Sequence, residues 1–326
     1  MTPSPPRRLA PALGLFVLAP LIGEGLLGNL TVSEMALLLP LLAPMYGAGA
    51  LLVREAARRA GRGPATMLVL GVAYGLVEEG LADQMLFNRY YAGHDLMGDT
   101  FIPALGMGGW LTVAVLTLHA VWSINVAIAL VEALVPRHAQ TPWLGRGQLA
   151  VTAMVFVAGS ALVGYGHYLE ERFVATPWQL GGTALAVVAL VVAAFRLPPA
   201  RPRAGAAPAP WAAGAGALVA GSLFLVTEFL PGWWGFAVAV GLTAVAVAWG
   251  TRWSRRADWG PRHRLALASG ALLAYAWTGF VTQPESAPKQ AADYVANAVL
   301  ATGAVLLIQC ARRRVAGRKR NRRTAT

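Results

Sequence analysis

The chain has 326 residues, of which 56% are hydrophobic and only 13% are charged. Soluble domains rarely combine so many apolar residues with so few charges, so the composition excludes an ordinary soluble globular protein. The formal net charge of +12 would favour nucleic-acid binding in a soluble chain, but the basic residues follow a membrane pattern, and we expect no nucleic-acid partner.

Long apolar runs recur along the whole chain. Each is about 18 to 25 residues long, which is the length that a helix needs to cross a hydrocarbon core of about 30 Å. We therefore predict an all-α fold, a polytopic transmembrane helical bundle of about ten spans. In chain order, the predicted spans are residues 9–27, 34–53, 64–86, 109–131, 149–169, 178–195, 211–229, 233–249, 265–281 and 291–309.

The basic residues are distributed unequally between the two sides of this predicted bundle. If the N-terminus is cytoplasmic and the spans alternate, 24 of the 27 basic residues are cytoplasmic, beginning with Arg7 and Arg8. Only Arg89, Arg172 and Lys289 are then external. Cytoplasmic loops of membrane proteins carry such an excess of Lys and Arg. The pattern predicts that both termini are cytoplasmic, in a multi-pass protein of the cell (plasma or inner) membrane.

The longest cytoplasmic connection divides the chain into two membrane halves. Residues 196–210 (RLPPARPRAGAAPAP) form a Pro- and Arg-rich linker, a composition typical of extended chain. The half at 1–195, with spans one to six, carries nearly all the intramembrane polar residues, whereas the half at 211–310, with spans seven to ten, is mostly Ala, Val, Leu and Gly. Residues 311–326 form a basic tail, which we expect to contact anionic lipid headgroups of the bilayer.

Span three contains three acidic residues within the segment GVAYGLVEEGLADQMLF, namely Glu78, Glu79 and Asp83. An ionised carboxylate at the bilayer centre costs at least about 2.5 kcal/mol, so these side chains must face other protein or a water-filled cavity. Glu79 and Asp83 are four residues apart and share a helix face with Gly75 and Gly71. Glycines spaced in this way mark close helix contact, so the acidic face is predicted to point into the bundle.

Span four reads LTLHAVWSINVAIALVE and places His119 at about the depth of Glu78. His119 and Ser123 share one helix face. Polar residues of spans one and five fall in the same, outer half of the membrane. We predict catalytic roles for Glu78, Glu79 and His119, in an outward-facing pocket that is lined by Glu24, Asp83, Ser123, Asn125 and His167.

Several of these residues also have a simpler interpretation, because a single embedded Glu or His can serve as a hydrogen-bonding group between helices. Glu228 precedes Leu-Pro-Gly and is interpreted as interfacial. His167 is followed by further polar residues and can lie at the surface. Glu132 lies near Arg137, and the two can form an ion pair at the cytoplasmic end.

The acidic pair on one span, with a His about 40 residues later on the next, resembles the CAAX-processing and bacteriocin-processing (CPBP/Abi) membrane proteases. That family carries EExxxR, FxxxH and HxxxN motifs on neighbouring helices. Glu78 and Glu79 match the acidic pair, Asp83 stands at the arginine position, and His119 matches the histidine of the second or the third motif. The resemblance covers spans three and four, and it implies a glutamate-dependent intramembrane hydrolase.

Two other functions fit the same residues. Intramembrane carboxylates exchange protons in transporters, and the ten-span layout resembles the drug/metabolite transporter superfamily in topology; Glu24, in APLIGEG, suits a discontinuous helix. A non-catalytic membrane subunit, whose acids pair with basic residues of a partner, is the third possibility. We expect no cofactor. Glu79, Asp83 and His119 are an alternative set of metal ligands, but since HExxH is absent we favour an acid–base site and predict no metal.

Overall fold

The computed structural model describes residues 9–198, 201, 203–284 and 286–323, with side chains described as far as residue 317 at the C-terminal end. Some predicted features therefore lie outside the described residues. These are Arg7 and Arg8, residues 199–200 and 202 of the linker, and residues 324–326 of the basic tail.

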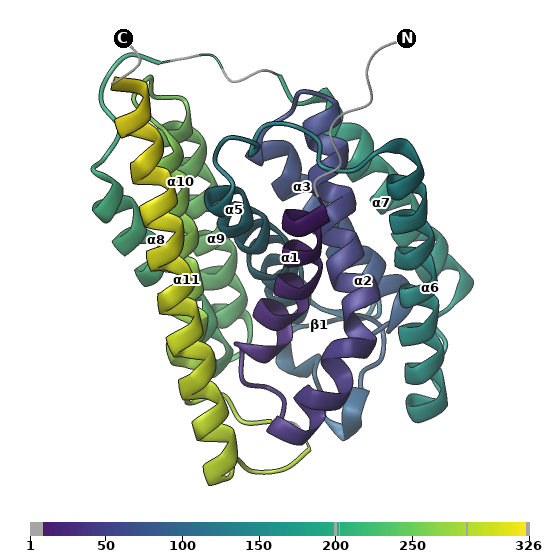
Figure 1. Cartoon of the computed structure of the whole chain (residues 1–326). Coiled ribbons are helices and arrows are strands. Elements are labelled where there is room, and N and C mark those ends of the chain that lie inside the picture. The colour runs from purple at the N-terminus through teal and green to yellow at the C-terminus, as the bar shows by residue number, and fades with distance from the viewer. Residues whose placement is uncertain (1–8, 199–200, 202, 285, 324–326) are drawn as a thin grey trace.

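The described chain forms a bundle of helices (Figure 1). The helices are α1 (Leu9–Pro20), α2 (Val32–Arg59), α3 (Pro64–Val77), α4 (Gly109–Leu118), α5 (Ala127–Leu134), α6 (Arg146–Glu171), α7 (Pro177–Arg196), α8 (Pro210–Leu225), α9 (Gly232–Ser254), α10 (Pro261–Thr278) and α11 (Ala291–Arg323). Short turns are η1 (Leu21–Gly25), η2 (Glu78–Ala82), η3 (Tyr91–Gly93), η4 (Gly98–Thr100), η5 (His119–Val126) and η6 (Val226–Phe229). The strands β1 (Phe101–Ile102) and β2 (Met107–Gly108) pair as an antiparallel hairpin.

Helical segments occupy all ten predicted span positions. Among the described residues, eight helices are both long and apolar enough to cross a membrane. A shorter apolar helix, Leu9–Gly25, is formed by α1 and η1, and the ninth predicted position is occupied by α10. The prediction of an all-α, polytopic membrane fold is confirmed.

The connections between helices alternate between two ends of the bundle. At one end, Arg62 of the α2–α3 turn donates to the carbonyl of Phe195 in α7 at 2.6 Å. At the other end, the amide of Val32 in α2 donates to Asp293 of α11 at 2.7 Å. The start of α1 and the end of α11 point toward the same end (Figure 1), as an even number of crossings requires. That the end with Arg62 is cytoplasmic stays a prediction.

Local sequence signals determine where several helices begin. Thr31 caps α2, because its hydroxyl accepts from the Glu34 amide at 3.3 Å while the Glu34 carboxylate accepts from the Thr31 amide at 2.7 Å. This reciprocal pair satisfies two donors that the first turn would leave unpaired. Pro64, Pro177 and Pro261 open α3, α7 and α10, where the missing N–H has no helical partner to lose.

Three helical runs widen into π-helical turns, and each of these turns carries polar residues. The turn η1 contains Glu24, η2 contains Glu78 and Glu79, and η5 contains His119 and Ser123. In η2 the amide of the residue after the turn, Asp83, donates to the carbonyl of Glu78 five residues earlier at 3.0 Å. Such π turns are often found at functional sites.

The two predicted membrane halves share one hydrophobic core. The Trp122 ring of η5 stacks on Tyr275 of α10, with ring centroids 4.7 Å apart and planes 7° apart. Its indole nitrogen donates to the Ala271 carbonyl at 2.7 Å. Helix α10 also packs on α5, and α9 packs on α4. The linker at 196–210 thus separates the two halves in the sequence, but their helices pack against each other in the structure.

Both predicted cytoplasmic segments have defined backbone in the part that the structure describes. Residues 311–323 of the basic tail continue α11 as helix. In the linker, the Arg203 amide donates to the Arg255 carbonyl at 2.9 Å, and the Ala207 amide donates to Asp258 at 2.9 Å. The linker therefore lies against the connection between α9 and α10.

The segment between η2 and α4 is hydrogen-bonded to the end of α6. Glu171 accepts from the Asn88 side chain at 3.0 Å and from the Ala92 amide at 2.9 Å. Within the segment, Arg89 and Asp95 form an exposed ion pair at 2.9 Å. The hydrogen bond from Arg89 lowers the pKa of Asp95 below its usual value. Side-chain contacts of this kind give the segment a defined path across the end of the bundle.

Candidate functional site

The centre of the polar cluster is the imidazole of His119, which lies between two carboxylates. Its Nε2 is 2.5 Å from Glu79 Oε1, and its Nδ1 is 3.0 Å from Glu78 Oε2. All three side chains are buried, with side-chain exposures of 8% for His119, 4% for Glu78 and 5% for Glu79. When the imidazole is protonated, it can pair with both carboxylates, which lowers the cost of burying them.

The π turn of η2 explains how two adjacent glutamates reach the same ring. In a regular α-helix, neighbouring side chains lie about 100° apart, so Glu78 would be turned away from the face of Glu79. The wider π turn reduces this angle, and both carboxylates contact His119. Ser123 lies in η5 together with His119, and its hydroxyl is 3.3 Å from His119 Nδ1.

Two glycines of α3 bring η5 close enough for these contacts. A Cβ on Gly75 would lie 3.3 Å from His119 Cβ and 3.2 Å from Leu116 Cδ2. A Cβ on Gly71 would lie 3.0 Å from Ala120 Cα. These are tighter than normal side-chain contacts, so the absence of side chains at both positions sets the distance between the two helices.

Two tyrosines surround the imidazole. The rings of Tyr46 from α2 and Tyr74 from α3 lie 5.8 and 6.1 Å from the His119 ring, centroid to centroid. The Tyr74 hydroxyl is buried beside the Glu78 carboxylate, without the alignment of a hydrogen bond. Sequence reasoning missed both tyrosines. Tyr74 lies four residues before Glu78, a spacing that puts the two on one helix face and could have identified it.

Glu24 is joined to this cluster through Tyr46. The Tyr46 hydroxyl donates to Glu24 Oε1 at 2.5 Å, and the side-chain nitrogen of Asn29 donates to Glu24 Oε2 at 3.1 Å. Gly23 makes room for the contact, because a Cβ there would lie 2.8 Å from the Ser123 hydroxyl and 2.9 Å from the Tyr46 ring. Glu24 is half-buried, and it is linked to His119 by the Tyr46 ring.

The structure places three other predicted pocket residues outside the direct contacts of His119. Asp83 is half-buried, and its carboxylate accepts from the Met85 amide at 3.1 Å in the turn after η2. Asn125 donates to the Ala120 carbonyl at 2.7 Å, within its own π turn. His167 hydrogen-bonds the Tyr91 hydroxyl, with Nδ1 at 2.9 Å, at the end of the bundle.

One carboxylate oxygen of each glutamate lacks a hydrogen bond. Oε2 of Glu79 is buried without a hydrogen-bond partner, whereas Oε2 of Glu78 lies 3.0 Å from His119 Nδ1 but without the alignment of a hydrogen bond. Leaving a buried polar atom unpaired costs about 1–3 kcal/mol, and more when it is charged. The Oε2 atom of Glu79, beside the imidazole, is therefore the atom of this cluster that is available to accept a proton.

A second buried charge cluster lies near the end of the bundle that contains Arg62. Glu132 accepts from Arg58 through both oxygens, at 2.8 and 2.6 Å, and its Oε1 is 3.1 Å from Arg54 Nε. The interpretation of Glu132 as a partner of Arg137 was wrong. Its partners lie on α2, about 75 residues earlier in the chain, and only tertiary packing brings them to α5.

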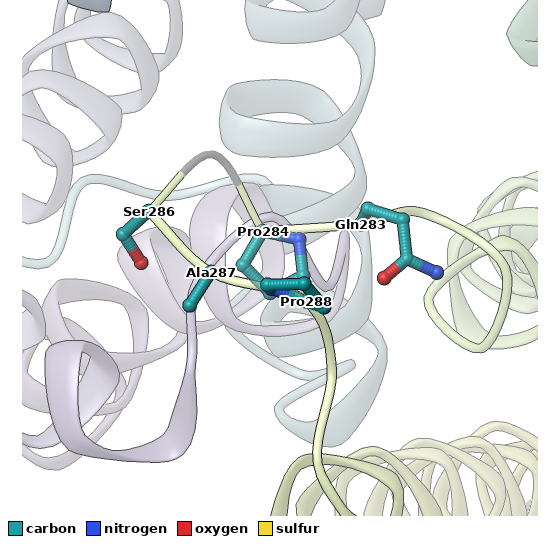
Figure 2. A pocket seen from close by; sticks show the side chains of 5 residues that line it. All are labelled: Gln283, Pro284, Ser286, Ala287 and Pro288. Carbon is teal, nitrogen blue, oxygen red and sulfur yellow. The ribbon is translucent and has the colours of Figure 1, made fainter.

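Two surface hollows of the described structure are lined by residues other than His119. One is lined by the α10–α11 loop (Figure 2), at Gln283, Pro284, Ser286, Ala287 and Pro288. Another lies between residues 134–138 and the end of α11. Among the described residues, no group of three or more His, Cys, Asp and Glu side chains is arranged to hold a metal ion.

A family model described as an uncharacterized membrane protein family matches residues 13–317, so the chain belongs to that family. No curated protein and no solved structure matches the chain.

Proposed function

We propose that this member of the uncharacterized membrane protein family is a glutamate-dependent hydrolase that cleaves an acyl bond in the membrane. The observation that carries the proposal is the buried imidazole of His119 between Glu79 and Glu78, at 2.5 and 3.0 Å. Packing two helices together requires at most one polar pair. A second buried acid on the same ring adds a desolvation cost that helix packing does not explain.

In the proposed reaction, Glu79 acts as the general base. Its Oε2 takes a proton from a water molecule, while the water oxygen forms a bond to the carbonyl carbon and the carbonyl electron pair moves to its oxygen. When the intermediate collapses, the oxyanion electron pair re-forms the carbonyl, the bond to the leaving group breaks, and the leaving group takes up the proton from Glu79 Oε2. His119 holds the other oxygen of Glu79 throughout. Glu78 holds the second imidazole nitrogen, and the Tyr74 hydroxyl is a donor for the oxyanion.

The resemblance to the CPBP/Abi proteases supports the same assignment, because its acidic pair and its histidine correspond to Glu78, Glu79 and His119. The chain differs from that family at Asp83, which has a carboxylate in place of a guanidinium. Here Asp83 accepts from the Met85 amide at 3.1 Å. Its proposed role is therefore to shape the backbone after η2, and no proton transfer is assigned to it.

The test uses full-length protein in lipid vesicles, with a library of fluorescence-quenched peptides that carry a membrane-anchoring apolar segment. We expect cleavage by the wild type and a loss of at least about 10²-fold in rate for Glu79→Gln, since Gln cannot take a proton from water. Glu228→Gln is the matched control, because Glu228 is exposed and far along the chain from the cluster. Cleavage that persists in Glu79→Gln would refute the proposal.

A proton-coupled transporter is the second candidate, and the position of Glu24 favours it. Glu24 lies in the π turn that ends the short first helix, and Tyr46 links it to the ring of His119. Carboxylates connected in this way are common in proton-coupled transporters. A solute flux that depends on Glu24 and on a pH gradient, without bond cleavage, would support this function. A non-catalytic subunit would show neither activity.

The long apolar helices imply that a lipid bilayer surrounds the protein. We add two proposals, one on which membrane this is and one on the lipids that the tail contacts. We place the protein in the plasma or inner membrane, with the Arg-rich end of the bundle in the cytoplasm. We also propose that the basic tail contacts anionic lipid headgroups, since each Lys or Arg near such a surface contributes about 1 kcal/mol.

A further inference from the structure

A basic groove lies between two segments that are far apart in the sequence. One wall is the loop at residues 134–138 after α5, and the other is the end of α11 with Arg313, Arg314 and Gly317. The loop contributes Arg137 to the lining. Arg137, Arg313 and Arg314 are all exposed, and none of them forms an ion pair with an acidic residue that the structure describes.

The buried side chain of Arg54 is hydrogen-bonded to the backbone of the loop that forms one wall of the groove. Its guanidinium donates to the carbonyls of His138, Ala139 and Thr141 at 3.3, 3.2 and 3.0 Å. The same guanidinium lies 3.2 Å above the ring of Trp143. The loop is therefore preorganised, and binding a ligand there does not require the cost of ordering it.

Two acidic residues close to this loop, one just before it in the chain and one that accepts from the Trp143 amide, are already paired with arginines. Glu132 is paired with Arg54 and Arg58, and Glu55 is paired with Arg54 and Arg59. This network contains three guanidinium groups, of which that of Arg59 is partly exposed, and two carboxylates, so it carries a net positive charge. The field in the groove favours an anion.

The length of α11 fits a groove at the depth of the lipid headgroups. From Ala291 to Arg313, α11 rises about 33 Å, at 1.5 Å per residue, which matches a hydrocarbon core of about 30 Å. Leu134 and Val135 give the groove an apolar part next to its cationic part. An apolar part next to a cationic part suits a phospholipid, whose phosphate and acyl chains are adjacent.

We propose that this groove binds the headgroup phosphodiester of an anionic phospholipid, with Arg137, Arg313 and Arg314 as its cationic partners. The proposal rests on the proposed contact of the basic tail with anionic headgroups, and it assigns that contact to a discrete site. Arginine suits this role because its guanidinium can donate two parallel hydrogen bonds to phosphate.

The experiment measures lipid binding to the full-length protein in detergent by native mass spectrometry, with phosphatidylglycerol and phosphatidylcholine as probes. Arg313→Gln/Arg314→Gln removes two groove charges, and Arg252→Gln/Arg312→Gln removes two exposed charges that do not line the groove. At about five-fold per arginine, the groove variant should bind phosphatidylglycerol roughly 25-fold more weakly. The control variant should bind it as the wild type does.

Three outcomes would overturn the site. An equal loss in both variants would mean that the tail attracts anionic lipid only through its overall charge, which leaves the general contact intact and removes the groove. Unchanged binding in the groove variant would exclude these arginines. Equally tight binding of glycerol 3-phosphate or of polyglutamate would identify a soluble phosphate or an acidic peptide as the ligand. Thermal unfolding of each variant checks that the fold is retained, and Arg313→Lys/Arg314→Lys should restore part of the binding.

Discussion

The buried ion pair between α2 and α5 allows a quantitative test of the fold. Substitution Glu132→Gln removes one negative charge and leaves Arg58 with a neutral partner. The two side chains are 2% and 9% exposed, for Arg58 and Glu132 respectively, and their contact is bidentate at 2.8 and 2.6 Å. Arg54 loses a carboxylate at 3.1 Å as well, although it keeps Glu55 at 2.8 Å.

The expected loss follows from this burial. Removing one partner of a buried pair costs about 3–5 kcal/mol, because the remaining charge is left without compensation. Gln keeps one oxygen that can accept from the guanidinium, so we expect a value near the lower limit, about 3 kcal/mol. At roughly 2–4 °C per kcal/mol, the thermal midpoint should fall by on the order of 10 °C.

The measurement is thermal unfolding of the purified protein in one detergent, followed by intrinsic tryptophan fluorescence. The control is Asp95→Asn, which breaks the Arg89–Asp95 pair; its side chains are 43% and 37% exposed, and such exposed pairs contribute about 0–1 kcal/mol. Glu132→Met with Arg58→Met should recover much of the loss, since paired apolar replacements avoid an unpaired charge. If Glu132→Gln shifts the midpoint no more than Asp95→Asn does, the burial argument is wrong.

Two further predictions concern the site and the topology. Gly75→Ala should lower the free energy of unfolding by about 1–3 kcal/mol and should also lower the proposed activity, because its Cβ would lie 3.3 Å from His119 Cβ. Gly181→Ala is the control and should change neither, because there is open space around Gly181. In a Cys310→Ser background, a membrane-impermeant thiol reagent applied to intact cells should label Ser286→Cys but not Ala206→Cys, and the reverse pattern would invert the predicted sidedness.

The depth of each polar residue follows from the sequence, while its partner depends on packing. Counting residues along spans three and four puts Glu78 and His119 at similar heights, because a helix rises by a constant amount per residue. The sequence does not give the rotation of one helix against its neighbour. That rotation depends on where Gly71 and Gly75 meet Leu116 and Ala120, and on the π turns that change the direction of the side chains.

Hydrophobicity and charge along the chain determined that the protein is a polytopic helical membrane bundle, and they placed its ten helical segments. These signals are local, since each apolar run must be long enough for the bilayer and each end must suit its surroundings. Only the tertiary structure decided that Tyr46 and Tyr74 surround His119, that Glu132 pairs with Arg58, and that His167 bonds to the loop. In a membrane, positions that face lipid and positions that face another helix are both apolar, so hydrophobicity does not distinguish them. Contacts between distant helices are therefore determined by shape and by polar pairing.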